Sequence, residues 1–458
     1  MSPQPASSPS EPGPALVPRR EAYLFWLRLG LISFGGPAGQ IAIMQRELVE
    51  RRRWISQQRF MHALNYCMLL PGPEAQQLAT YLGWLMHRTA GGLVAGVLFI
   101  LPSLLLLVGL SYLYMAHGQQ PLAAAVLYGL KPAVAAIVLH AVYRLGARCL
   151  EHPARRPLPW LLAVGAFVAL TVLNLPFPWL ILAALLLGWG AVRLAPRVLG
   201  ELPAQGVAER AGQAATALID DHTPSPDHAR PRTVRLLSVL AAGLALWMLP
   251  MLALLAVWGW QGTLTQMATF FTRAALLTFG GAYAVLPYVQ QAAVEHYQWL
   301  TTAQMMDGLA LGESTPGPLI MVVAFVAFVG GWGQQVLGPD GLFAGAALAA
   351  VVATWFTFLP SFIFILAGGP WVEATRGWAA LSTALRAVTC TVIGVMASLG
   401  WTFFQAVVFP APQGRFDAIA LALLALALWL LLRRNWGVVR TLLLSAALGV
   451  LVLNNGVI

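Results

Sequence analysis

The feature that most constrains the fold is a pair of similar stretches in which glycine and proline lie inside long apolar runs. The first is Ser33-Phe34-Gly35-Gly36-Pro37, and the second, 245 residues later, is Thr278-Phe279-Gly280-Gly281. The same spacing places Pro71-Gly72-Pro73 on Pro316-Gly317-Pro318, and Trp54 on Trp299. Glycine and proline interrupt helices and leave backbone N–H and C=O groups without helical partners. The repeat therefore predicts two related halves, each built on broken helices.

The composition places these breaks in a membrane. Hydrophobic residues make up 59% of the chain and charged residues only 10%, and the mean hydropathy is +0.73. A soluble domain has no need of so many apolar residues. In lipid, the backbone groups freed at a break need partners, so a broken helix lies against protein or lines a polar cavity. We expect an all-α integral membrane protein.

Apolar runs near the ~20 residues that cross a bilayer predict about 13 transmembrane or re-entrant segments. Six fall in each half and one lies between the halves, so the second half is expected to be upside down relative to the first. The sequence thus predicts an inverted repeat of two six-segment halves. The expected segments are residues 23–44, 60–86, 91–115, 121–144, 158–173, 175–194, 236–258, 264–286, 305–332, 341–366, 381–408, 416–432 and 438–453.

The polar stretches set the expected domain boundaries. Residues 1–20 are rich in proline, serine and alanine without the order of a signal peptide, and are expected to form a disordered tail. Residues 196–233 show no apolar period and are expected to form an exposed, polar cytoplasmic linker. The first repeat then covers 21–195, an extra connecting helix covers 234–262, and the second repeat covers 263–458.

The arginines give an independent indication of topology. A net charge of +10 is typical of nucleic-acid binding, but these arginines lie between apolar runs, as expected of topology-setting loops. With a cytoplasmic N-terminus, the arginine-rich loop from Arg46 to Arg59 falls on the wrong side. The conflict disappears if the first two segments are re-entrant hairpins bent at their glycine and proline breaks. We favour hairpins over full spans, and expect the loop from Gln290 to Gln304, which has no Arg or Lys, to be external.

Four motifs in a fixed order give the chain a family resemblance. They are Phe34-Gly35-Gly36-Pro37, Glu47-Leu48-Val49 with Trp54, Leu70-Pro71-Gly72-Pro73-Glu74-Ala75-Gln76, and Leu101-Pro102-Ser103. Because of these motifs, the sequence resembles the chromate ion transporter (CHR) family in its long, two-domain form. The resemblance covers essentially the whole chain apart from the N-terminal tail and the linker. The second half carries a degenerate copy with Leu359-Pro360-Ser361, with Ala282 in place of Pro37, and with Glu313 before its Pro-Gly-Pro triplet.

The resemblance implies a secondary-active exporter of chromate in the bacterial inner membrane, which confers chromate resistance. The membrane potential, or the proton gradient in an antiport cycle, would drive it. Sulfate or a related oxyanion is the alternative cargo, because tetrahedral dianions offer the same charge and geometry. A membrane-embedded enzyme that acts on lipid headgroups is the alternative from another class, although no nucleophile stands beside a base. The expected partners are an oxyanion and the lipid bilayer, not nucleic acid, with a homodimer left open.

A tetrahedral dianion needs fixed positive charge and oriented donors. Lys131 and Arg386 lie near the middle of their apolar runs, at matching positions in the two halves. A charge at mid-depth costs about 2.5 to 3.5 kcal/mol, so such residues face a cavity or a partner. Arg28 and Arg273 form a second matched pair, although Arg28 lies near enough to its segment's end to reach the interface. We hypothesise that these four cations converge on a midplane cavity between the halves.

The glycine breaks are expected to add donors to the same substrate site. Freed N–H groups and the positive end of a helix dipole suit an anion, whereas the alternative role of such glycines is close helix packing. The residues expected to bind the anion in this way are Ser33, Gly35, Gly36, Thr278, Gly280 and Gly281.

Two carboxylates flank the Pro-Gly-Pro breaks, and we consider them candidates for proton coupling. Glu74 and Glu313 would change charge as an anion comes and goes beside them. The alternative is a helix cap, or a structural ion pair with Lys131 or Arg386. Asp307 is the other carboxylate near membrane depth, and no role is assigned to it.

No cofactor or metal is expected. Cys67, Cys149 and Cys390 are too scattered for a disulfide framework or a zinc site, and the acidic and histidine cluster from Asp220 to His228 has no recognised ligand spacing. No phosphate-binding glycine loop or catalytic triad motif occurs in the sequence. We therefore expect a transporter and not an enzyme.

Overall fold

The computed structural model of the chain describes residues 17–34, 36–150, 157–194, 217–219, 228, 232–279, 281–372, 379–410 and 414–454. Within these ranges the chain is helical, with one isolated backbone bridge between Ile55 and Ile219 and no strand. Gly35, Gly280, most of the expected tail and most of the expected linker lie outside the described residues.

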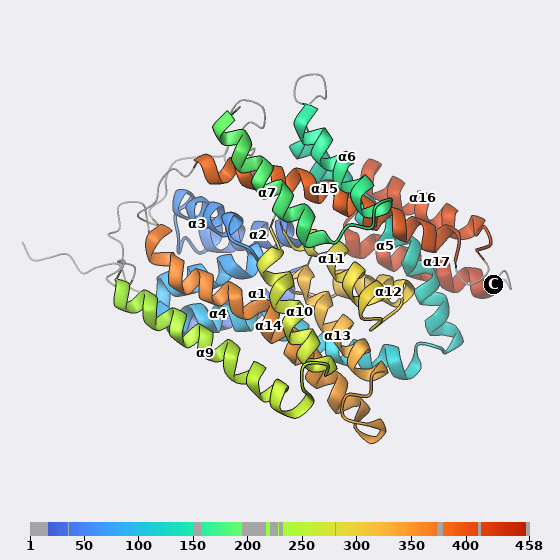
Figure 1. The fold of residues 1–458 in the computed structure, drawn as a ribbon, viewed down its shortest axis with the longest axis horizontal. Helices are drawn as coiled ribbons and strands as arrows, with labels where there is room; N and C mark the ends of the chain where they lie inside the picture. The colour runs from blue at the N-terminus through green and yellow to red at the C-terminus, as the bar shows by residue number, and fades with distance from the viewer. Residues whose placement is uncertain are drawn as a thin grey trace, which may run out of the picture.

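The first half, a connecting helix and the second half follow one another along the chain (Figure 1). The first half contains α1 (Arg19–Ile32), α2 (Gly36–Gln45), η1 (Arg46–Arg51), α3 (Gln57–Leu69), α4 (Glu74–His117), α5 (Pro121–Cys149), α6 (Pro157–Thr171) and α7 (Phe177–Leu194). A single helix, α9 (Thr233–Trp258), connects it to the second half. The second half contains α10 (Thr263–Leu277), η3 (Ala282–Val285), α11 (Leu286–Gln290), η4 (Gln291–His296), α12 (Thr302–Ser314), η5 (Leu319–Met321), α13 (Val322–Gly333), η6 (Pro339–Gly341), α14 (Leu342–Val372), α15 (Ala379–Val408), α16 (Ala418–Arg433) and α17 (Val438–Asn454).

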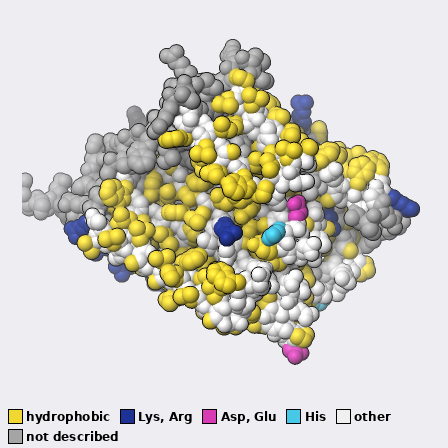
Figure 2. Space-filling view, in the orientation of Figure 1, with side chains coloured by type: hydrophobic (Ala, Val, Ile, Leu, Met, Phe, Trp, Pro, Cys, Tyr) yellow, Lys and Arg dark blue, Asp and Glu magenta, His cyan; other side chains and the backbone are white. Residues whose placement is uncertain are grey.

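The protein is an all-α integral membrane protein, as predicted. Five stretches, in α4, α5, α9, α14 and α15, are long and apolar enough to cross a bilayer. The shorter apolar helices α6, α7, α13, α16 and α17 add to the apolar layer. Figure 2 shows hydrophobic side chains over much of the visible face, as expected for a surface that contacts lipid chains.

Unusual local structures recur in the two halves at the spacing found in the sequence. The π-helices Arg46–Arg51 and Gln291–His296 lie 245 residues apart. Two residues further on, Arg53 and Gln298 both adopt left-handed conformations, with φ of 53° and 52°. Helices α3 and α12 then begin behind a hydroxyl cap, in which Ser56 and Thr301 accept a hydrogen bond from the backbone N–H three residues later. The same sequence spacing therefore produces the same backbone path.

The structure corrects several expected segment boundaries. Segments 23–44, 60–86, 264–286 and 305–332 are each divided into helical pieces by a break. A helix such as α1, with 14 residues, is about 21 Å long, too short for a ~30 Å hydrocarbon core. The expected segments 60–86 and 91–115 are joined by a single helix, α4, which is kinked at His87 and Arg88.

Contacts at the ends of the first two segments support re-entrant hairpins rather than full spans. Arg52, which follows η1, forms an ion pair at 3.0 Å with Glu21 in the first turn of α1. His87, at the kink of α4, lies 2.7 Å from the carbonyl oxygen of Val17, just before α1. After each of the two segments, the chain has therefore returned to the level at which α1 begins. We call this end of the first half its hairpin base.

The second half has a matching hairpin base. Trp299 packs on Phe270 with ring centroids 5.8 Å apart, as Trp54 packs on Phe25 at 5.3 Å in the first half. The connecting helix α9 links the two bases. Near its start, Arg235 donates a hydrogen bond to Thr89, beside the kink of α4, at 3.2 Å.

At the other end of α9, Trp258 donates a hydrogen bond at 3.4 Å to the carbonyl oxygen of Val336, just after α13. The two hairpin bases therefore lie at opposite ends of a helix long enough to cross a bilayer.

The halves also exchange helix partners. Helix α5 of the first half packs against α16 and α17 of the second, and α15 of the second half packs against α6 and α7 of the first. Figure 1 shows α5 among the red C-terminal helices and α15 beside the green helices α6 and α7. Neither half is thus a separate bundle, and the polar sites lie where the two halves interpenetrate.

The described part of the expected linker contacts the first half instead of being wholly exposed. Ile219 donates a backbone hydrogen bond to Trp54 and accepts one from Ser56, at 3.1 and 3.0 Å. Leu218 and Ile219 pack on the apolar cluster of the first hairpin base. The physical reason is that these two apolar residues interrupt a polar stretch and can cover an apolar surface.

Candidate functional site

The broken helices of the two halves cross at the centre of the protein. The N–H of Gly72 donates to the carbonyl oxygen of Thr278 at 2.8 Å, and the N–H of Gly317 donates to that of Ser33, also at 2.8 Å. Each Pro-Gly-Pro break is thereby paired with the Gly-Gly break of the other half. We call this region the crossing. It confirms that the two kinked elements predicted from the sequence meet.

Glycine is required at both Pro-Gly-Pro breaks for two reasons. Gly72 and Gly317 have φ of +124° and +109°, which side chains rarely allow. A Cβ atom on Gly72 would also collide with the side chain of Ser361, and one on Gly317 would collide with Ser103. These serines belong to the two Leu-Pro-Ser motifs, and each faces the break of the opposite half. The motifs that mark the family resemblance in the sequence therefore meet in space.

The crossing contains buried polar groups. Gln40 donates to the carbonyl oxygen of Gly317 at 2.5 Å, and Gln77 donates to that of Pro71 at 2.7 Å. By contrast, the Ser33 hydroxyl and the side-chain oxygens of Gln76 and Gln77 are buried with no hydrogen-bond partner among the described residues. Buried polar atoms normally have partners, so these three are available to a small polar ligand.

The two carboxylates predicted for proton coupling lie at the crossing. Glu313 accepts a hydrogen bond from the Tyr283 hydroxyl at 2.7 Å, and a Cβ atom on Gly36 would lie 3.7 Å from that hydroxyl. A Cβ atom on Gly281 would lie 3.8 Å from Glu74. Each glutamate is therefore close to a Gly-Gly break. Their role in proton coupling stays a prediction.

Lys131 lies in the wall of a large cavity between the halves. The cavity has a volume of about 1130 Å³ and is lined by α5, by the loop of the second hairpin base from Gln298 to Thr301, by the start of α12, and by the end of α15. A second cavity of about 450 Å³, lined by the turn after α4 and by Asp307, shares Lys131 with the first. The lysine thus contributes a cation to a space large enough for a hydrated oxyanion.

The other predicted cations are placed differently. Arg386, the counterpart of Lys131, is only 2% exposed and lies beside Cys390 on α15. Arg28 and Arg273 are exposed on α1 and α10, and neither lines the cavity that contains Lys131. Their helices bury the opposite, apolar face. The predicted convergence of all four cations on one cavity is therefore wrong in this structure, while their roles in binding stay predictions.

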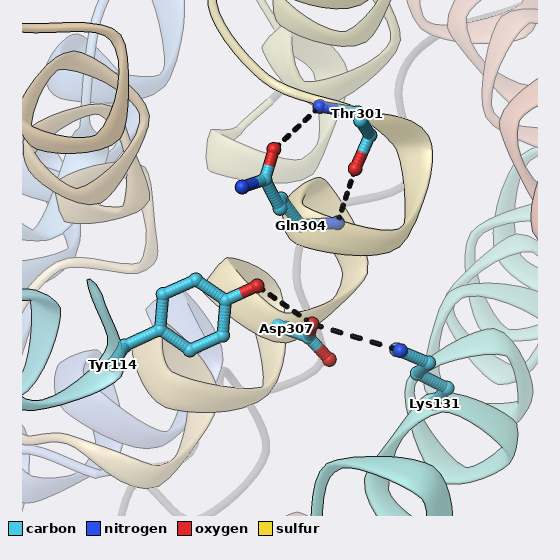
Figure 3. A network of polar contacts seen from close by, with 5 residues as sticks. All are labelled: Tyr114, Lys131, Thr301, Gln304 and Asp307. Atoms are coloured by element: carbon cyan, nitrogen blue, oxygen red, sulfur yellow. Dashed lines mark hydrogen bonds and ion pairs between the residues drawn. The ribbon is translucent and has the colours of Figure 1, made fainter. Parts of the chain in front are cut away.

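The ion-pair partner of Lys131 is a residue to which sequence reasoning gave no role. The ammonium lies 3.7 Å from Asp307 of α12 and not against Glu74 or Glu313, the partners considered from the sequence (Figure 3). Asp307 accepts a further hydrogen bond from Tyr114 at 3.0 Å. At the 245-residue spacing, Asp307 corresponds to His62 in the first half. Because the first half has no acid at the matching position, the repeat did not point to Asp307 as a functional residue.

These features define a multi-pass helical membrane protein whose two related halves meet at broken helices, with a cavity between the halves that Lys131 and Asp417 help to line. The chain belongs to the chromate transporter family. The family model described as "Chromate transporter" matches residues 20–189 and 265–450, one stretch in each half. This confirms the resemblance inferred from the sequence motifs.

Individual relatives cover most of the chain. It is 33% identical to the "Chromate transport protein" of Pseudomonas aeruginosa over 397 residues, which are 86% of this chain and 82% of the relative. It is 30% identical to the "Chromate transport protein" of Cupriavidus metallidurans over 405 residues, 88% of this chain and 87% of the relative. A third relative, the "Uncharacterized transporter YwrB" of Bacillus subtilis, is 30% identical over 134 residues, 29% of this chain and 68% of the relative. No solved structure matches the chain.

Proposed function

We propose that this protein is a secondary-active transporter that moves chromate out of the cell across the bacterial inner membrane and so confers chromate resistance. The proposed cargo is supported by membership of the chromate transporter family. It is also supported by two relatives named chromate transport protein, since this chain matches 82% and 87% of their lengths. The observation that carries the proposal is Lys131, which lines a cavity of about 1130 Å³ between the halves.

In this proposal the dianion first binds at Lys131 in the cavity and meets the crossing as the halves rearrange, because no crossing residue that the structure describes lines that cavity. An ammonium supplies a point charge, and the helix N-termini at Gly36 and Glu74 add the positive ends of their dipoles. The Ser33 hydroxyl, buried without a partner among the described residues, is a further donor. Discontinuous helices whose N-termini point at a bound anion are the usual substrate sites of secondary transporters.

Alternating access follows from an inverted arrangement of the halves. The support for inversion is that the two hairpin bases lie at opposite ends of α9, through the contacts of Arg235 and Trp258. Lys131 faces the cavity bounded by the second hairpin base, whereas its counterpart Arg386 is buried. A movement of the halves that buries Lys131 and opens a cavity at Arg386 would carry an anion from one side of the membrane to the other. The membrane potential or the proton gradient would drive this movement.

Sulfate is the second candidate cargo. A lysine, a hydroxyl and helix N-termini recognise charge and tetrahedral shape, which chromate and sulfate share. We expect sulfate to compete with chromate for the same site.

Bacterial growth on chromate tests the proposed function. A chromate-sensitive strain that expresses the protein should grow at chromate concentrations that stop the parent strain, and protection should increase as sulfate in the medium is lowered. Lys131→Gln should remove the protection, because a charge-assisted contact to the dianion is lost. Arg148→Gln, which changes an exposed cation near the end of the same helix, is the control and should protect like wild type. No protection by the wild-type protein at normal protein levels would contradict the proposal.

A further inference from the structure

The ion pair beside the cavity joins a partly exposed cation to a buried acid. The Lys131 side chain is 32% exposed, whereas the Asp307 side chain is 3% exposed. Both Lys131 and the Tyr114 hydroxyl contact the same carboxylate oxygen, Oδ2 (Figure 3). The other oxygen, Oδ1, is buried and has no hydrogen-bond partner among the described residues. A carboxylate held on one side and bare on the other is poorly stabilised in its charged form.

An anion that enters the cavity competes with Asp307 for Lys131. Within the described part of the chain, Lys131 is the cation that contacts Asp307 at ion-pair distance. If a dianion takes this ammonium, the ionised carboxylate faces both the loss of its counter-ion and the repulsion of a double negative charge. A proton on Asp307 removes both penalties. Protonation of Asp307 and binding of the anion therefore favour each other.

We propose that Asp307 is a proton-binding residue linked to substrate: when an oxyanion takes the ammonium of Lys131, Asp307 takes up a proton from water in the cavity. This inference rests on the proposed function and adds a residue and a coupling rule to it. The anion and the proton occupy the protein together, which favours their movement in the same direction over their exchange. A dianion that leaves with one proton still carries a net negative charge, so the inside-negative membrane potential drives its export.

Among the groups at this site, Asp307 is the one that we expect to gain and lose a proton. The titratable or charged side chains that face it are Lys131 on α5 and Tyr114 on α4. Tyr128 on α5 is engaged with Asp417 at 2.8 Å, and Glu313 on α12 itself is engaged with Tyr283.

The remaining elements that pack on α12 add no competing acid. Helix α13 and the short helix η5 contain no charged residue. Arg440 on α17 is exposed, and Arg386 on α15 lies beside Cys390.

The test is the pH dependence of anion affinity in the purified, full-length protein. Chromate binding, with sulfate as a second probe that does not titrate in this range, is measured from weakly acidic to weakly alkaline pH. In wild type, the affinity should fall by up to about tenfold per pH unit as pH rises, the limit for one linked proton. Asp307→Asn imitates the protonated acid, so this variant should bind sulfate tightly with an affinity that no longer depends on pH.

Three further variants make the result decisive. Asp307→Glu keeps a titratable acid and should keep the pH dependence, and Asp340→Asn, an exposed acid before α14, should behave as wild type. Tyr114→Phe removes a donor to the ionised carboxylate and should move the loss of affinity to higher pH.

The outcomes separate the two proposals. A pH dependence in Asp307→Asn equal to that of wild type overturns the role of Asp307 while leaving the transporter in place. The absence of chromate and sulfate binding by folded wild-type protein at any pH overturns the proposed function, and this inference with it.

Discussion

At the scale of single residues, the site depends on the glycines of the crossing and on the ion pair between Lys131 and Asp307. The glycines of the Pro-Gly-Pro triplets were identified correctly as breaks, because only glycine tolerates φ near +110° to +125° at Gly317 and Gly72. The partner of Lys131 was not identified. Asp307 lies 176 positions further along the chain, and a single sequence gives no signal for a contact between α5 and α12.

Replacement of a crossing glycine should destabilise the protein. Gly317→Ala would strain the backbone and force a methyl group against Ser103, so the expected loss is about 1 to 3 kcal/mol or more, measured by thermal unfolding in detergent. Gly72→Ala should have a similar effect, because Gly72 meets Ser361 in the same way. Gly109→Ala is the control, since nothing lies within 4 Å of its added methyl group. Equal stability of Gly317→Ala and Gly109→Ala would show that the crossing is not tightly packed.

At the scale of elements, the spacing of 245 residues predicted which helices break, and the π-helices and caps recur at that spacing. The boundaries of whole spans were less accurate. A break such as that between α1 and α2 contains only a few residues. The hydropathy pattern therefore continues across the break, and two short helices were predicted as one span. The pairing of each break with the other half could not be predicted, because it depends on tertiary packing and not on local sequence.

Cysteine labelling tests the hairpins and the inversion together. Gln57 and Thr302 are the first residues of α3 and α12 and occupy matching positions in the two hairpin bases. In a background without Cys67, Cys149 and Cys390, which are all buried, Gln57→Cys should react with a membrane-impermeant maleimide only from the cytoplasm. Thr302→Cys should react only from outside. Labelling of both positions from the same side would contradict the inverted arrangement.

At the scale of the whole molecule, interpenetration of the halves places Lys131 of the first half against Asp307 of the second. Because α5 packs among helices of the second half and α15 among helices of the first, movement of one half relative to the other must change the surroundings of Lys131 and Arg386. The membrane class and the presence of two halves could be predicted from composition and repeat. The exchange of helix partners between the halves could not be predicted, because neither the composition nor the repeat indicates which helices pack together.

Transport of chromate through this cavity can be measured as chromate flux in proteoliposomes that contain only this protein, with the membrane potential set by a potassium gradient and valinomycin. We expect chromate to move toward the positive side at a rate that increases with the potential, is inhibited by sulfate, and falls at least about tenfold in Lys131→Gln. Arg148→Gln should stay within about twofold of wild type. Flux in Lys131→Gln equal to that of wild type, or no chromate movement by the wild-type protein, would contradict the claim that this cavity carries the anion across the membrane.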